Sequence, residues 1–257
     1  MSLGCAAVNV MISNRWIKKD AHHFLAQGQW FGSLPAPMQE AIIAHSEIVS
    51  FPTNATVFKL GDPVDGVYAA LEGDLRAYAG VGEDRFFFRA LGPGSWFGDL
   101  NLLDLEGSKR GIDVCAASPA AALFLPTAAY RELTESDPAI YRAFVQLLCT
   151  HARYASRIVI ESRSEAPRRT ARALLRLARA HGVAGTDGTR LAMNLSQADL
   201  ASLVGVSRQY MNELIARWEQ EGMLRWNGKS QPLLNEEQLG SLLGPLDAWI
   251  REHEDWV

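Results

Sequence analysis

The spacing of hydrophobic residues changes its period near residue 135. From residue 45 to residue 125, short apolar pieces such as Val67–Leu71 and Phe86–Phe88 alternate with turn signals about every ten residues. Gly61-Asp62-Pro63 and Gly92-Pro93-Gly94 are two of these turns. Short strands at such a spacing are typical of a β-sandwich or β-barrel. This part of the chain is therefore predicted to be all-β, with a topology that the spacing alone does not fix.

A long helix is predicted to follow. Asp137 is a favourable N-cap residue, and Pro138 is tolerated in the first turn of a helix. Side chains beyond them recur at spacings of 4, 3, 4, 3 and 4, the pattern of a coiled-coil seam. The members of this seam are Ile140, Phe144, Leu147, His151, Tyr154 and Ile158. We interpret the seam as a dimerisation surface, and packing on the β domain of the same chain is the alternative.

Two short helical patterns meet at a turn between residues 197 and 218. Leu200 and Ala201 are expected to face inward on the first helix. Gly205 suits the positive φ angle of a tight turn, and Ser207 suits the N-cap of the second helix. Met211 continues the apolar stripe of the second helix. This arrangement is typical of a helix-turn-helix, with an ordinary helical hairpin as the alternative.

The residues after these helices indicate a winged helix. Asn227-Gly228 between strand-like residues predicts a hairpin. The second helix would then enter a major groove, where its first turns meet base edges. The residues predicted to read bases are Arg208, Gln209, Asn212 and Glu213. Those predicted to contact phosphates are Ser196, Gln197, Ser207, Arg217 and Lys229. Structural alternatives remain, because Gln197 could cap its helix and Glu213 could pair with Arg217.

The charge is distributed in a way that agrees with a nucleic-acid partner. The whole chain has a formal net charge of −4. Residues 164–231 nevertheless carry ten Lys or Arg against six Asp or Glu, whereas residues 232–257 carry one Arg and six acidic residues. A basic segment beside an acidic one predicts that residues 164–231 meet the DNA.

Other functional classes find little support in the sequence. The three cysteines, Cys5, Cys115 and Cys149, are far apart, which favours a reducing cytoplasm over a disulfide framework or a metal site. No apolar run reaches the length of a membrane span, and the first residues lack the charged region of a secretory signal. Residues 46–125 contain no histidine, so a metal-dependent enzyme of the cupin type is not expected.

The alternative to a DNA-binding protein is a protein that senses a cyclic nucleotide and acts through protein partners, without binding DNA.

Taken in order, these elements resemble the family of the cyclic-AMP receptor protein and the fumarate–nitrate regulator, the Crp/Fnr family. The resemblance rests on four stretches: Phe51 to Gly73, Gly94 to Leu100 with Arg110, Arg172 to Ala178, and Leu200 to Leu224. It implies an α+β protein with an N-terminal β-sandwich (a double-stranded β-helix of the cyclic-nucleotide-binding type), a long dimerisation helix and a C-terminal winged helix-turn-helix. The expected segments are an N-terminal arm (1–20), effector domain (21–135), dimerisation helix (136–164), winged helix (165–231) and acidic helical tail (232–257).

The resemblance also places an effector pocket, in which several residues depart from the family pattern. Its expected members are Gly98, Asp99, Leu100, Arg110, Gly111, Ile112 and Tyr154. In the cyclic-AMP receptor a glutamate accepts from the ribose, an arginine pairs with the cyclic phosphate and a small hydroxyl residue follows. In this chain Asp99 is one methylene shorter than that glutamate, Gly111 lacks the hydroxyl of the small residue after the arginine, and Ile112 is bulky. Cyclic AMP is therefore disfavoured, which leaves a different small molecule or a collapsed pocket with Arg110 paired to Asp99.

The remaining expectations concern cofactors and partners. The cysteine cluster that holds an iron–sulfur centre in the fumarate–nitrate regulator is missing, since only Cys5 lies near the N-terminus, and lone histidines are weak evidence for haem. The resemblance implies a bacterial homodimer on double-stranded DNA. The acidic tail, whose helix is predicted to begin after Asn235, could pack on the winged helix or contact RNA polymerase.

Overall fold

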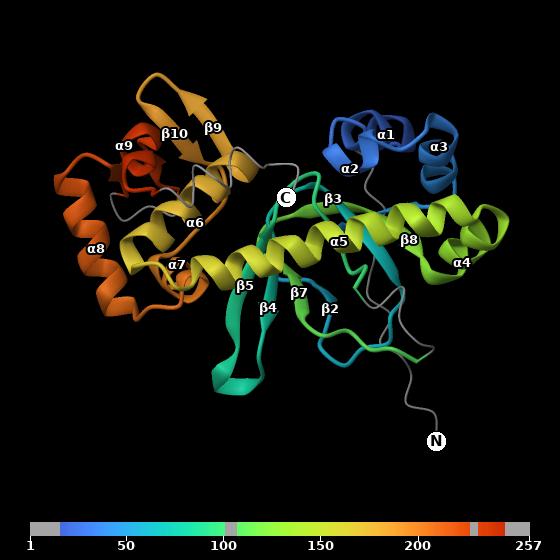
Figure 1. Cartoon of the computed structure of the whole chain (residues 1–257), viewed down its shortest axis with the longest axis horizontal. Coiled ribbons are helices and arrows are strands. Elements are labelled where there is room, and N and C mark those ends of the chain that lie inside the picture. The colour runs from blue at the N-terminus through green and yellow to red at the C-terminus, as the bar shows by residue number, and fades with distance from the viewer. Residues whose placement is uncertain (1–15, 101–106, 227–230, 245–257) are drawn as a thin grey trace. The chain divides into compact units, whose positions relative to one another are not determined.

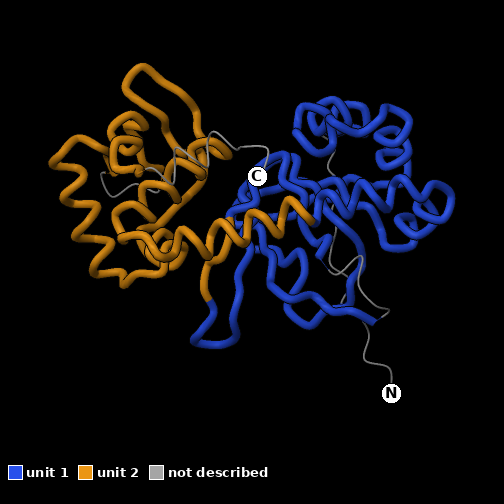
Figure 2. Tube along the Cα trace, in the orientation of Figure 1, with its two compact units in different colours: residues 1–85, 90–148 blue, residues 86–89, 149–257 orange. Residues whose placement is uncertain are grey.

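The computed structural model describes residues 16–100, 107–226 and 231–244. The chain forms two compact units, one of residues 1–85 and 90–148 and the other of residues 86–89 and 149–257 (Figure 2). Helix α5 (Pro138–Glu161) contributes residues to both units. The finer division into five segments stays a prediction.

Two four-stranded sheets make up most of the first unit (Figure 1), although residues 86–89 of the second sheet belong to the second unit. In the first sheet the strand order is β1 (Glu47–Phe51), β8 (Ala120–Pro126), β3 (Gly66–Glu72) and β6 (Trp96–Phe97). In the second it is β2 (Thr56–Phe58), β7 (Asp113–Ala116), β4 (Leu75–Ala79) and β5 (Phe86–Leu91). A 3₁₀ turn at Gly82–Asp84 lies between β4 and β5. The β-rich N-terminal domain predicted from the turn spacing is confirmed.

Strand β3 is buried on both of its faces, which explains the unbroken apolar run in its sequence. Because successive side chains point to opposite faces, Val67, Ala69 and Leu71 enter one hydrophobic cluster, whereas Tyr68 and Ala70 enter the other. Its neighbour β8 divides its side chains between the same two clusters. One cluster fills the space between the sheets, and the other fills the space between the first sheet and the surrounding helices.

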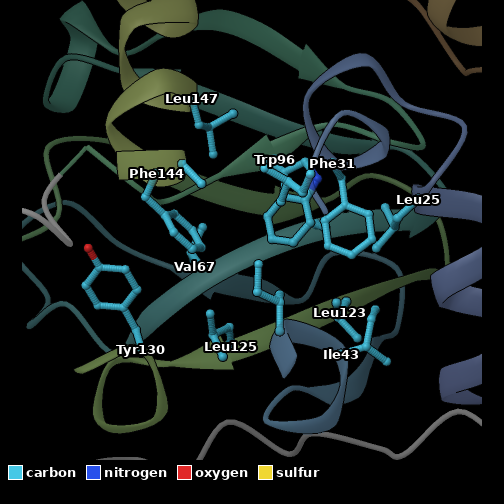
Figure 3. Packing of buried hydrophobic residues seen from close by; sticks show 14 of the residues in the cluster. Leu25, Phe31, Ile43, Val67, Trp96, Leu123, Leu125, Tyr130, Phe144 and Leu147 are labelled. Carbon is cyan, nitrogen blue, oxygen red and sulfur yellow. The ribbon is translucent and has the colours of Figure 1, made fainter. Parts of the chain in front are cut away.

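Helices cover the outer face of the first sheet. They are α1 (Lys18–Leu25), α2 (Gln29–Gly32), α3 (Ala36–Ala44), α4 (Thr127–Ser136) and the first half of α5. Figure 3 shows the aromatic centre of this layer, where the ring of Phe31 stacks on Trp96 at 5.5 Å between centroids. The ring of Phe144 meets Tyr130 edge to face at 5.0 Å. The first half of α5 is thereby packed on the first unit of its own chain.

This packing corrects the first half of the predicted dimer seam, and the second half stays a prediction. Ile140, Phe144 and Leu147 are at most 3% exposed, and all three belong to the hydrophobic core of their own chain. The other members of that seam, His151, Tyr154 and Ile158, are half-buried. The same 4-3-4-3-4 spacing recurs one residue later, on a more accessible face of α5 about 100° around the helix from the first row. Its members are Tyr141, Val145, Leu148, Ala152, Ala155 and Val159, and we call them the outer stripe.

The second unit combines helices with a small antiparallel sheet. Its helices after α5 are α6 (Ala166–His181), α7 (Gln197–Val204), α8 (Arg208–Gln220) and α9 (Glu236–Ser241). The sheet has the order β11 (Leu224–Arg225), β12 (Leu233–Leu234), β10 (Gly188–Leu191) and β9 (Gly182–Gly185). The sequence pattern predicted only a helix end at Gly182–Gly185, where the structure has a strand that pairs with β10. Strands β11 and β12 pair on either side of the predicted hairpin turn at Asn227-Gly228, which lies outside the described residues and stays a prediction.

Candidate DNA-binding surface and effector pocket

The turn between α7 and α8 has the geometry that the sequence predicts for a helix-turn-helix. The hydroxyl of Ser196 accepts from the backbone N–H of Asp199, and the Asp199 carboxylate accepts from the N–H of Ser196, so the two form a capping box. Gly205 has a φ angle of 74°, a left-handed conformation that favours glycine. Ser207 caps α8 by accepting from the N–H of Tyr210. These contacts fix the direction in which α8 begins.

Helix α8 has one buried and one exposed face. Met211, Leu214, Ile215 and Trp218 are at most 2% exposed and anchor the helix in its unit. The four residues predicted to read bases, Arg208, Gln209, Asn212 and Glu213, are all exposed. The Gln209 amide donates to the Glu213 carboxylate at 3.1 Å, a contact that the sequence-based pairing of Glu213 with Arg217 did not anticipate. The arrangement leaves a polar edge able to offer both donors and acceptors to bases.

The residues predicted to contact phosphates surround this edge. Ser196, Ser207 and Arg217 are exposed, and Gln197 is half-buried as the first residue of α7. Capping uses acceptor positions of the two serine hydroxyls, which keep their O–H to donate to a phosphate oxygen. Lys229 and the Asn227-Gly228 turn lie outside the described residues. An unpredicted candidate is Tyr210, a side chain 37% exposed in the first turn of α8.

Two further contacts hold the helix-turn-helix in place, and sequence reasoning missed both. The backbone N–H of Phe87, the second residue of β5, donates to the Ser202 hydroxyl at 2.8 Å. The Arg169 guanidinium donates to the carbonyls of Val204 at 3.3 Å and Ser164 at 2.6 Å. Both contacts join segments distant in sequence, so no local spacing could reveal them.

Arg110, the expected phosphate ligand of the effector pocket, is bound by the protein itself. Its side chain is 2% exposed, and its two Nη atoms donate to the carbonyl oxygens of Gly98 and Gly66, each at 2.6 Å. One Nη also pairs with the carboxylate of Asp65, which the sequence analysis did not identify as a pocket residue. The guanidinium lies 4.1 Å from the ring centroid of Phe58. Both Nη groups of Arg110 are thus already engaged, whereas its buried Nε has no hydrogen-bond partner among the described residues.

Aromatic rings fill the space beside Arg110. Tyr68 stacks on Phe97 at 5.4 Å and on Phe124 at 4.7 Å between centroids. The Tyr68 hydroxyl donates to Asp65 at 2.7 Å, and burial together with that carboxylate raises the pKa of the phenol. Ile112 packs against the same cluster. Aromatic and aliphatic side chains therefore pack against one another on this side of Arg110.

The other predicted pocket residues differ in exposure. Asp99 is 2% exposed, whereas Leu100 is 60% exposed and Gly111 is exposed. Tyr154 belongs to the second unit, where the Arg89 guanidinium lies 4.8 Å from its ring centroid. The role of Tyr154 in effector binding stays a prediction. Within residues 16–100, 107–226 and 231–244, no group of three or more His, Cys, Asp or Glu side chains is placed to hold a metal ion.

An exposed recognition helix on a winged unit, joined to a β-sandwich sensor, defines a DNA-binding transcription regulator. The family models agree with both halves: a Crp-like helix-turn-helix domain matches residues 168–242, and a cyclic nucleotide-binding domain matches residues 48–137. The chain belongs to the Crp/Fnr family of transcription regulators.

Relatives across the length of the chain support this assignment. The chain is 26% identical over 217 residues to a CRP-like cAMP-activated global transcriptional regulator of Mycobacterium tuberculosis, covering 84% of this chain and 96% of the relative. It is 28% identical over 209 residues to the CRP-like protein Clp of Xanthomonas euvesicatoria, covering 77% and 88%. A CRP/FNR-family transcriptional regulator from Thermus thermophilus superposes with a TM-score of 0.63 at 27% identity, covering 76% and 97%.

In the described part of this chain, none of the helices combines the length and hydrophobicity of a membrane span.

Proposed function

We propose that two copies of this chain pair along the outer stripe of α5 and place their α8 helices on a palindromic DNA operator. The observation that carries the proposal is the division of α8 into a firmly buried face and an exposed polar edge that begins at Arg208. Recognition helices of a twofold-symmetric pair contact half-sites about 34 Å apart, one turn of DNA. In this proposal Arg208 and Gln209 read bases, and Arg217 contributes to phosphate binding.

The outer stripe is suited to self-association. Tyr141 and Val159 are 48% and 66% exposed, and large apolar side chains in a regular helical row favour burial against a partner. Ala152 and Ala155 are small, so two helices could approach closely at the middle of the stripe. A row with a period of 3.5 residues faces a partner helix along its whole length. The stripe thus replaces the predicted inner seam as the dimer surface.

The proposed regulation is a shift between two states of the dimer. A small molecule that binds the sensor domain would favour one arrangement of the paired helices, and the operator would bind that arrangement more tightly. Because the contacts of Arg110 disfavour a cyclic nucleotide, we assign the effector to a different chemical class. RNA polymerase is the expected protein partner when the regulator is bound to DNA.

Selection from a random duplex library, followed by binding measurements on the selected and scrambled sites, tests the proposal. A bidentate Arg–guanine contact discriminates by about 1–3 kcal/mol, so Arg208→Ala should reduce the preference for the selected site by roughly 5- to 150-fold for each half-site. The matched control is Arg190→Ala, which removes an exposed arginine of the same unit outside α8. If wild-type protein selects no sequence, or if both variants lose preference equally, α8 does not read DNA and a sensor acting through protein partners becomes the better account.

A further inference from the structure

Helix α8 exposes an aromatic side chain beside the residues proposed to read bases. This side chain, Tyr210, lies in the first turn of the helix and is 37% exposed. The other large apolar side chains of α8 are at most 2% exposed and form its buried face, namely Met211, Leu214, Ile215 and Trp218. Tyr210 therefore lies outside the buried face, in the turn that meets the base edges when a recognition helix enters the major groove.

The backbone of the first turn fixes the direction of Tyr210. Its N–H donates to the Ser207 hydroxyl at 3.1 Å, so residue 210 is tied to the cap of the helix. Successive residues of a helix are about 100° apart, so Arg208 and Tyr210 flank Gln209 on its two sides. Helical side chains also tilt towards the N-terminus, which directs the Tyr210 ring to the end of α8 that begins at Arg208.

The polar neighbours of Tyr210 leave one feature of the major groove without a matching group. Arg208 offers hydrogen-bond donors, and Gln209 with Glu213, joined by a hydrogen bond of 3.1 Å, adds an amide and a carboxylate. Such groups recognise the nitrogen and oxygen atoms of guanine, adenine and cytosine. Thymine differs from these bases in its C5-methyl group, which an apolar side chain recognises. In the first turn of α8, the exposed apolar ring is that of Tyr210.

We propose that the ring of Tyr210 reads the C5-methyl group of a thymine in each half-site of the operator. This inference rests on the proposed function, because it requires α8 to lie in the major groove. Packing the ring against the methyl group removes apolar surface of both from water, which favours binding. A phosphate contact through the hydroxyl would supply position without sequence information, a task already assigned to Ser196, Ser207 and Arg217.

Replacing thymine with deoxyuridine in the selected operator tests the proposal, because only the C5-methyl group is removed. Burial of one methyl group changes affinity about fourfold, so we expect a loss of about fourfold for one half-site and about fifteenfold for both. Fluorescence anisotropy at one fixed salt concentration measures this loss. A selected half-site without thymine, or losses below about twofold at every thymine, overturns the proposal while sequence selection by α8 stands. If wild-type protein selects no sequence, the proposed function and this inference fail together.

Three variants assign the methyl contact to the ring. Tyr210→Ala should bind the thymine and deoxyuridine operators equally, whereas Tyr210→Phe, which loses only the hydroxyl, should keep the wild-type difference. Gln220→Ala is the matched control, because it removes an exposed side chain at the other end of α8 and should also keep that difference. All three side chains are exposed, so urea midpoints should match wild type.

Two results with these variants would overturn the proposal. A deoxyuridine loss that persists in Tyr210→Ala assigns the methyl contact to another residue. A difference that disappears in Tyr210→Phe assigns the effect to the hydroxyl and not to the ring.

Discussion

Replacing Leu148 with lysine should separate the two chains without unfolding either one. Leu148 belongs to the outer stripe and is half-buried in the single chain. A lysine there can keep its ammonium in water while its methylenes lie along the helix, so the isolated chain should lose little stability. In a twofold pair both copies of Leu148 would become fully buried, and because each is already half-buried the gain is about 0.7–1.5 kcal/mol each, half of the value for complete burial. Losing both contributions, about 1.5–3 kcal/mol in total, weakens the dimer by roughly 10- to 150-fold.

Leu147, the preceding residue, provides the matched comparison. It is 3% exposed in the core of its own chain. Leu147→Ala should lower the free energy of unfolding by about 2–5 kcal/mol, since buried methyl groups are removed and a cavity remains. A loss of that size is a large part of the total stability of a typical domain, about 5–15 kcal/mol.

Sedimentation velocity over a range of protein concentrations, combined with unfolding by urea, distinguishes the two residues. We expect Leu148→Lys to sediment as a folded monomer, and Leu147→Ala to remain associated when folded but to unfold at lower urea. The opposite outcome, a folded monomer for Leu147→Ala and an unchanged dimer for Leu148→Lys, would restore the inner seam and refute the outer stripe.

Three further outcomes are expected. Calorimetric titration with cyclic AMP should show no saturable binding below about 1 mM, because rearranging Arg110 would break several charge-assisted hydrogen bonds; micromolar affinity would contradict this reasoning. Asp113→Asn should destabilise the protein at pH 7 and have little effect near pH 2. Partial burial favours a raised pKa for Asp113, but the Leu60 N–H and Arg85 outweigh the burial and lower that pKa. The carboxylate therefore stabilises the fold above about pH 4, the pKa of Asp in the unfolded chain, and this contribution is lost as the pH falls through the pKa of the folded state. An equal loss at both values would assign the effect to packing. Phe144→Ala should lower the free energy of unfolding by about 3–5 kcal/mol, and urea midpoints unchanged from wild type would remove Phe144 from the core.

The winged unit could be predicted closely because its signals are local. Gly205, Ser207 and the Asn235 cap each need a particular residue type at a particular backbone conformation, and the structure has each of them there. Strands β9 and β10 were missed because Gly182–Gly185 has the glycines of a helix end, while its strand pairing depends on a partner segment. Helical periodicity alone cannot reveal such a pairing.

The seam and the effector pocket could be predicted only in part, for a different reason. Periodicity shows that α5 has apolar rows, but two rows one residue apart carry the same spacing, and only the packing of Phe144 against Trp30 and Tyr130 decides which row is the core. Likewise, the sequence identifies Arg110 but not its partner Asp65, which precedes it by 45 positions. Contacts of long sequence separation depend on topology, which spacing does not encode.

The alternating burial of β3 limits how this sensor can be retuned. A strand that touches water on neither side offers no position where a new ligand contact can be added without disturbing one of two packed layers. Substitutions that change which ligand the sensor recognises, whether natural or engineered, are therefore confined to the rim of the sandwich, where Leu100 and Gly111 reach solvent. The packed interior of the sandwich therefore stays constant, and new ligand contacts have to arise at its exposed rim.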